Sequence, residues 1–96
     1  MIQKDEEHYR VSGAAVIANA RTLLETGRSF LLADSGKEVT LDFSAVKEVD
    51  SSALSVIFGL VRVANRHGVA LRLANPPASL LSLAGLYGVS DFLPLT

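Results

Sequence analysis

The residues of this chain whose types most suggest chemistry are an aspartate followed by two serines, Asp50-Ser51-Ser52. A serine acts as a nucleophile when a nearby base takes its proton, and that base must come within about 3 Å of the hydroxyl. The candidate base, His67, lies at the far end of the helix that the apolar run after Ser52 predicts. At 1.5 Å per residue it is more than about 20 Å from Ser51. The sequence therefore predicts no catalytic residue here.

Other signatures of enzymes and metal sites are missing as well. The chain has no cysteine, no histidine pair with ligand spacing, no phosphate-binding glycine loop and no dinucleotide fingerprint. Asp42, Glu48 and Asp50 are close in sequence and could form an acid pair. We interpret Asp42 instead as a polar strand position and Glu48 as a solvated loop residue. We expect no metal and no cofactor.

The two serines can be interpreted in two ways, as part of a helix cap or as a functional site. An aspartate or serine before a helix is an ordinary N-cap, which contributes about 1 kcal/mol. The sharper hypothesis is a switch site, because a helix N-terminus presents unpaired N–H groups and the positive end of a dipole. A phosphate on Ser51 would add negative charge there and would repel or recruit a partner. The cap pattern alone leaves both open.

The helix predicted over residues 52–67 has two distinct sides at 100° per residue. Its buried stripe is Ala53, Ile57, Leu60 and Ala64. Its outward side is Ser51, Ser55, Phe58, Gly59 and Arg62. The aromatic ring of Phe58 on this side could be a lone exposed residue, could pack under the first helix, or could anchor a partner.

Strand and helix patterns alternate along the chain. We predict strands over residues 8–12, 39–43 and 70–74, and helices over 16–33, 52–67 and 75–87. We expect Asn75 to cap the third helix and Gly88 to end it, with residues 44–50 as a connecting turn. The alternation predicts one α/β domain over residues 1–96, with α-helices packed on a small sheet.

Composition excludes several classes of partner. The formal net charge is -1, from 9 basic and 10 acidic residues mixed along the chain, which gives no electrostatic argument for nucleic acid or for an anionic membrane. Residues 1–7 are polar and lack the apolar core of a signal peptide. The longest apolar run, residues 53–64, is too short and too interrupted to span a bilayer. We expect a cytoplasmic protein without direct membrane insertion.

The stretch from Val39 to Leu95 resembles the STAS domain family, the fold of bacterial anti-sigma-factor antagonists. The resemblance rests on "VTLDFS", the Asp-Ser-Ser helix start, "GVALRLAN" and "GVSDFLPL". It implies a small mixed sheet with packed helices. In that family the first hydroxyl after the aspartate is phosphorylated or contacts the partner, which carries onto Ser51, and Ser52 fits the second position. The family usually has glycine next, where this chain has Ala53.

The compact length and the ending "LLSLAGLYGVSDFLPL" look more like one branch of that family. This branch is the small cytoplasmic STAS subunit of the ABC transporter that moves phospholipids between the membranes of Gram-negative bacteria and maintains outer-membrane lipid asymmetry. There the subunit binds the ATPase subunit and supports its assembly and activity. The alternative is an antagonist that binds a serine-kinase anti-sigma factor and is switched by phosphorylation at Ser51. A small hydrolase, the third hypothesis, rests on the serines alone. The expected partner-binding or switch residues are Ser51, Ser52, Ser55, Phe58 and Arg62.

Overall fold

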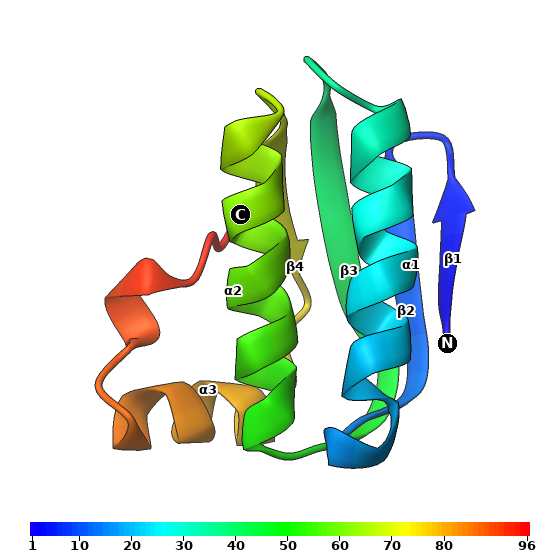
Figure 1. Ribbon diagram of the computed structural model, residues 1–96. Helices are drawn as coiled ribbons and strands as arrows, with labels where there is room; N and C mark the ends of the chain where they lie inside the picture. Colours follow the sequence, from blue (N-terminus) through cyan, green and yellow to red (C-terminus); the bar gives the residue numbers. More distant parts are fainter.

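The computed structural model describes residues 1–96 as a four-stranded sheet with two long helices on one face (Figure 1). The strands are β1 (Ile2–Asp5), β2 (His8–Ala15), β3 (Glu38–Val49) and β4 (Ala70–Ala74). The helices are α1 (Ala20–Ala33), α2 (Ser51–Arg66) and α3 (Ala78–Leu86), with short 3-10 turns η1 (Ile17–Asn19) and η2 (Ser90–Phe92). The predicted order of strands and helices is therefore confirmed from residue 8 onward.

The sheet is mixed and its strands follow the order β1-β2-β3-β4. β1 pairs with β2 antiparallel, whereas β2 with β3 and β3 with β4 are parallel. Parallel neighbours need a long crossover, and α1 and α2 supply the two crossovers. The expected pairing of residues 39–43 with 70–74 is confirmed, with Val39 opposite Leu71 and Leu41 opposite Leu73.

Two strand segments differ from the predictions. Residues 2–5 form β1 and turn back into β2 at Glu6, which has a φ of 57°. Their polar composition hid this strand, because a short edge strand presents one buried side chain, Ile2, among polar ones. The predicted turn over residues 44–50 is wrong, since β3 continues to Val49. Its pairing with β2 shifts register twice in this part, which breaks the alternation that would have identified a strand.

The predicted cap at Asn75 is also wrong. Asn75 has a φ of 54°, and α3 begins at Ala78 after Pro77. The Asn75 side chain donates instead to the Asp42 carboxylate, with Nδ2 3.1 Å from Oδ1. Asp42 is buried, and it also accepts from the Ser44 N–H at 2.9 Å and lies 3.4 Å from His8 Nε2. Burial alone would raise the pKa of Asp42, but these hydrogen bonds hold it below its usual value.

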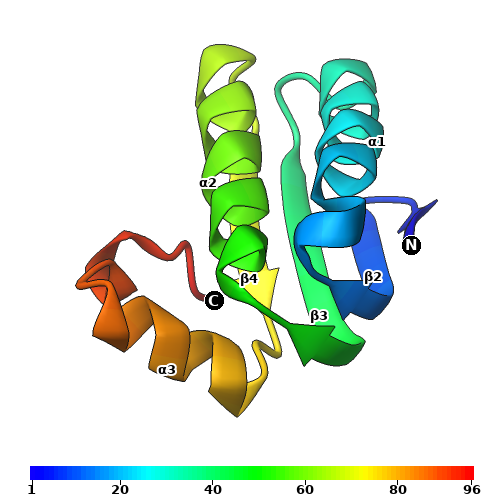
Figure 2. The same cartoon turned by 60° about the horizontal axis from the view of Figure 1, so that its bottom comes forward.

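The hydrophobic core lies between the sheet and the pair α1 and α2, and Figure 2 shows these two helices side by side. Two glycines let them approach closely. A Cβ at Gly27 of α1 would lie 2.8 Å from Leu60 Cδ2, and a Cβ at Gly59 of α2 would lie 2.8 Å from Leu24 Cδ1. Gly59 was predicted on the outward side of its helix, and this is wrong because it is buried against α1. The predicted stripe through Ala53 and Ile57 is buried, as expected.

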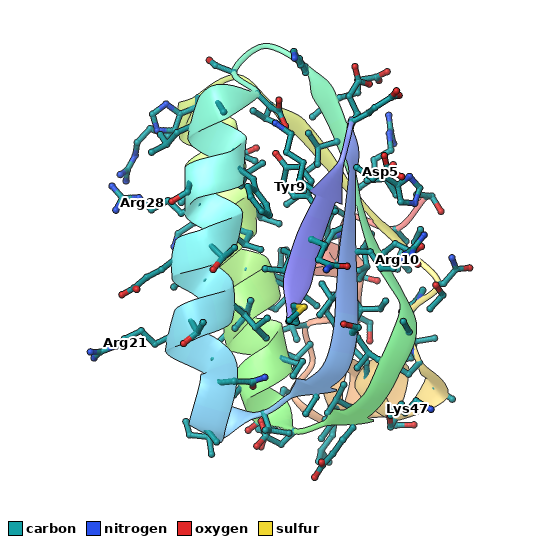
Figure 3. The ribbon with its side chains drawn as sticks, turned by 90° about the vertical axis from the view of Figure 1, so that its right-hand side faces the viewer. Asp5, Tyr9, Arg10, Arg21, Arg28 and Lys47 are labelled. Carbon is teal, nitrogen blue, oxygen red and sulfur yellow. The ribbon has the colours of Figure 1, made fainter.

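A polar cluster closes the core at the C-terminal end of α1. Asp34 is buried, and its Oδ2 accepts from the buried Tyr9 hydroxyl at 2.6 Å. Its Oδ1 accepts from Lys4 Nζ at 2.9 Å, and Lys37 Nζ lies 3.5 Å away. Figure 3 shows Tyr9 directed from β2 into the space between the sheet and α1. The cluster ties β1, β2 and α1 together.

Candidate partner-binding site

The N-terminus of α2 is held in place by Asp50, the residue just before it. Asp50 Oδ1 accepts from the Ser52 N–H at 2.8 Å, which is an N-cap hydrogen bond. Its Oδ2 accepts from the Ile17 N–H at 3.0 Å, so one carboxylate joins the start of α2 to the turn before α1. The hydrogen bond from Ile17, with that from Ser52, lowers the pKa of Asp50. Both oxygens of the Asp50 carboxylate therefore already accept hydrogen bonds from within the fold.

Because Asp50 makes the cap, Ser51 does not. Ser51 is the first residue of α2 and is exposed, and its hydroxyl makes no hydrogen bond within the chain. Ser55 is exposed one turn later on the same side. The N-cap is therefore Asp50 and not a serine. The Ser51 hydroxyl remains accessible to a group of another molecule.

A shallow hollow of about 340 Å³ begins at these serines. Its lining is Ser51, Leu54, Ser55, Phe58, Tyr87 and Val89. The Phe58 ring is half-buried, since one part packs on the core and another part faces the hollow. α3 and the residues that follow it run beside α2 (Figures 1 and 2), and this segment supplies Tyr87 and Val89 to the hollow. The hollow combines two serine hydroxyls with aliphatic and aromatic side chains, which suits a protein contact better than a small polar substrate.

Three of the five predicted site residues, Ser51, Ser55 and Phe58, thus share one hollow. Ser52 is half-buried and does not line it. Arg62 is exposed but reaches the other way: its Nη2 lies 3.8 Å from where a Cβ at Gly59 would stand, on the side of α1. The predicted line along α2 is therefore divided between an apolar side next to α3 and a basic side next to α1.

Sequence reasoning missed the contribution of α3 and the residues after it. Only Leu80 and Ala84 of α3 are buried, although the helix also carries Leu81 and Leu86 on its exposed side. Leu86 is 78% exposed, Tyr87 58% and Phe92 70%. A signal was present in the sequence, because a short helix with more leucines than one buried face can hold exposes some of them, and exposed apolar side chains that gather in a patch mark a contact surface.

A larger hollow, of about 650 Å³, lies at the β1–β2 hairpin and carries mixed charges, among them Glu7, Arg10 and Arg72. It does not contain the serines. No three His, Cys, Asp or Glu side chains gather to form a metal site. None of the helices has both the length and the apolar character to cross a bilayer.

The comparison with known proteins agrees with this architecture. The structure of SpoIIAA, an anti-sigma factor antagonist in its unphosphorylated form, matches with a TM-score of 0.73 and 13% identity, over 100% of this chain and 86% of that one. A crystal structure of a putative anti-sigma factor antagonist from Thermotoga maritima matches with a TM-score of 0.76 and 18% identity, over 99% and 83%. At these identities the likeness concerns the fold.

A comparison with curated protein sequences found no match. The family model described as "Mlab, STAS domain" matches residues 2–95, nearly the whole chain. The mixed sheet, the long helix that starts at Asp50-Ser51-Ser52 and this match lead to one conclusion: the chain belongs to the STAS domain family.

Proposed function

We propose that this chain is a non-catalytic binding subunit that docks on the ATPase subunit of a phospholipid-transporting ABC complex, in the cytoplasm. The observation that carries the proposal is the hollow in which the free Ser51 hydroxyl adjoins Phe58 and the exposed residues after α3. The family match, whose description names Mlab, supports this branch. STAS domains are generally regulatory and work by protein contacts, which fits a surface without an assembled catalytic group.

The chemistry of the hollow is that of an interface core. Aromatic side chains such as Phe58 and Tyr87 provide large apolar area with few rotatable bonds, and such residues dominate binding energies. Around them Ser51 can donate a hydrogen bond to a carbonyl or carboxylate of the partner. A negative charge introduced at Ser51 would be desolvated on binding, and this would oppose the complex.

The test is calorimetric titration of the purified chain with the ATPase subunit of that ABC complex from the same genome. Phe58→Ala is expected to weaken binding by about 2 kcal/mol or more, and Ser51→Glu to weaken it also. Because its ring is only partly buried, Phe58→Ala should lower the free energy of unfolding by only about 1–2 kcal/mol.

The matched control is Phe30→Ala. Phe30 is also half-buried, but it packs against the Tyr9 ring at 5.3 Å between centroids, on the other side of α1. This variant should lose stability while its folded fraction binds normally. If Phe58→Ala and Phe30→Ala bind equally well, the hollow is not the interface.

The alternative function is an anti-sigma-factor antagonist that binds a serine-kinase anti-sigma factor. The exposed Ser51 hydroxyl at the start of α2 favours it, since a kinase needs an accessible hydroxyl. Incubation with the candidate kinase and ATP, followed by mass spectrometry, would detect a phosphate on Ser51. The Ser51→Ala variant should remain unmodified. Phosphate transfer together with no binding to the ATPase subunit would establish the alternative.

A further inference from the structure

The charges of this chain are unevenly distributed in space, although they are mixed along the sequence. α1 carries Arg21 and Arg28, α2 carries Arg62 and Arg66, and Glu25 is the only acidic residue within the two helices. All of these arginines are exposed, and none forms an ion pair within the chain. The outer side of the helix layer is thus basic in a chain whose net charge is -1.

The packing of the two helices gathers these arginines on one surface. Arg21 and Arg28 lie two turns apart on α1, and Figure 3 shows both projecting away from the sheet. On α2, Arg62 and Arg66 are one turn apart on the outward side. Arg62 reaches over Gly59, the residue at which Leu24 of α1 makes contact. Because the glycines bring the helices close together, the exposed arginines of both helices belong to one continuous helix layer.

We propose that this basic surface, defined by Arg21, Arg28, Arg62 and Arg66, docks on an acidic surface of the partner protein, beside the apolar contact made at the Phe58 hollow. The inference rests on the proposed function, because it describes the chemistry of the same partner. The partner then carries apolar side chains for the hollow next to α3 and carboxylates for the arginines of α1 and α2. The helix α2 belongs to both contacts, so one partner surface can cover them together.

The observations favour a protein over other anionic partners. Every basic residue of the surface is arginine, whose planar fork forms bidentate hydrogen bonds with carboxylates. The net charge of the whole chain, -1, gives no general attraction to nucleic acid or to anionic membranes. The adjoining apolar hollow has the mixed character of a protein interface. Charges at the edge of such an interface act mainly on the association rate and on its salt dependence.

The test measures binding to the purified ATPase subunit at several NaCl concentrations, for the wild type and for the double variant Arg28→Glu/Arg66→Glu. The double variant should bind at least about tenfold more weakly at low salt, and its affinity should no longer fall as salt rises. Lys47→Glu is the matched control, because Lys47 is exposed and Figure 3 places it on the opposite side of the sheet. It should bind like the wild type.

The outcomes separate this inference from the proposed function. If the wild type binds and the double variant binds equally well with the same salt dependence, the basic surface is not part of the interface, while the proposed function stands. If the wild type does not bind the ATPase subunit, the proposed function fails, and the same titration with the serine-kinase anti-sigma factor then decides. Binding to neither protein overturns both.

Two further measurements test whether the basic surface binds a lipid membrane or a second copy of this chain instead. Sedimentation with vesicles of phosphatidylglycerol and phosphatidylcholine should leave the wild type in solution, and arginine-dependent sedimentation would assign the surface to lipid instead. Analytical ultracentrifugation should show that the wild type is a monomer. If the wild type self-associates and the double variant does not, the occupant is the acidic hairpin of a second copy, Asp5-Glu6-Glu7, and the proposal is wrong.

Discussion

Removing the Tyr9 hydroxyl should destabilise this protein more than the loss of one oxygen atom suggests. In Tyr9→Phe the ring stays in place, but Asp34 loses the 2.6 Å hydrogen bond to its Oδ2. Both residues are buried, at 0% and 1% exposure, so no water replaces the donor. A hydrogen bond to a charged group contributes about 1.5–3 kcal/mol net. We expect a loss of that size, which for a domain of this length lowers Tm by about 4–8 °C for each kcal/mol.

The assay is urea unfolding followed by far-UV circular dichroism, because the chain has no tryptophan. A double-mutant cycle with Asp34→Asn isolates the pair, and its coupling energy should be about 1.5–3 kcal/mol at pH 7. Lys4 contributes less, since 30% of its side chain is exposed and solvent screens its ion pair. A coupling energy below about 0.5 kcal/mol would refute the reasoning.

The pH dependence gives an independent check. The hydrogen bond from Tyr9, together with Lys4, holds the pKa of Asp34 below its usual value in the folded state. Its contribution is therefore present above the ordinary pKa of about 3.9 and is lost as the pH falls through the lower folded pKa. Burial, with the Asp34 carboxylate, raises the pKa of Tyr9. The unfolded chain then ionises first, above about pH 10, and stability falls there in the wild type but less in Tyr9→Phe.

Other substitutions test the packing. Ile57→Ala, at a fully buried site, should lower the free energy of unfolding by about 2–5 kcal/mol in the same urea assay. Gly27→Ala should lower Tm, because overpacking against the buried Leu60 costs about 1–3 kcal/mol and outweighs the better helix propensity. Gly85→Ala should have the opposite effect, because a Cβ at Gly85 meets nothing nearer than 3.8 Å. Its free energy of unfolding should increase by about 0.4–1 kcal/mol, and its Tm should rise. A higher Tm for Gly27→Ala would show that the helices are not in close contact.

The periodic part of the fold was predictable from the sequence, and the irregular part was not. The stripe of α2 and the strands around Val39 and Leu71 follow regular patterns that burial imposes on helices and strands. The prediction for Asn75 was wrong because asparagine is a common N-cap residue, whereas here its side chain donates a hydrogen bond to Asp42, which is distant in sequence. The prediction for Gly59 was wrong because a helical wheel places it on the outward side, whereas a residue without a side chain leaves room for Leu24 of the other helix to pack against it.

The candidate site was predictable in part for the same reason. The exposure of Ser51 and Ser55 follows from helix geometry, and both were expected. The cap by Asp50 is local, but the second hydrogen bond of its carboxylate, from the Ile17 N–H, comes from another part of the chain, which no local pattern contains. The neighbours Tyr87 and Val89 come from a tail whose direction after Gly88 is set by packing. The basic surface likewise needed the pairing of α1 with α2 before it could be recognised.

The pairing of the C-terminal residues with β4 has a consequence for how this protein meets other chains. Leu73 donates to the Pro94 carbonyl at 2.7 Å, and Thr96 donates back to the Leu73 carbonyl at 3.1 Å. These bonds occupy backbone groups on the outer edge of the sheet, which would otherwise template the addition of a foreign strand. At the other edge β1 offers only four residues, with Lys4 among them. Addition of a foreign strand is thereby disfavoured at both edges, and aggregation through the β4 edge is discouraged by the same few hydrogen bonds.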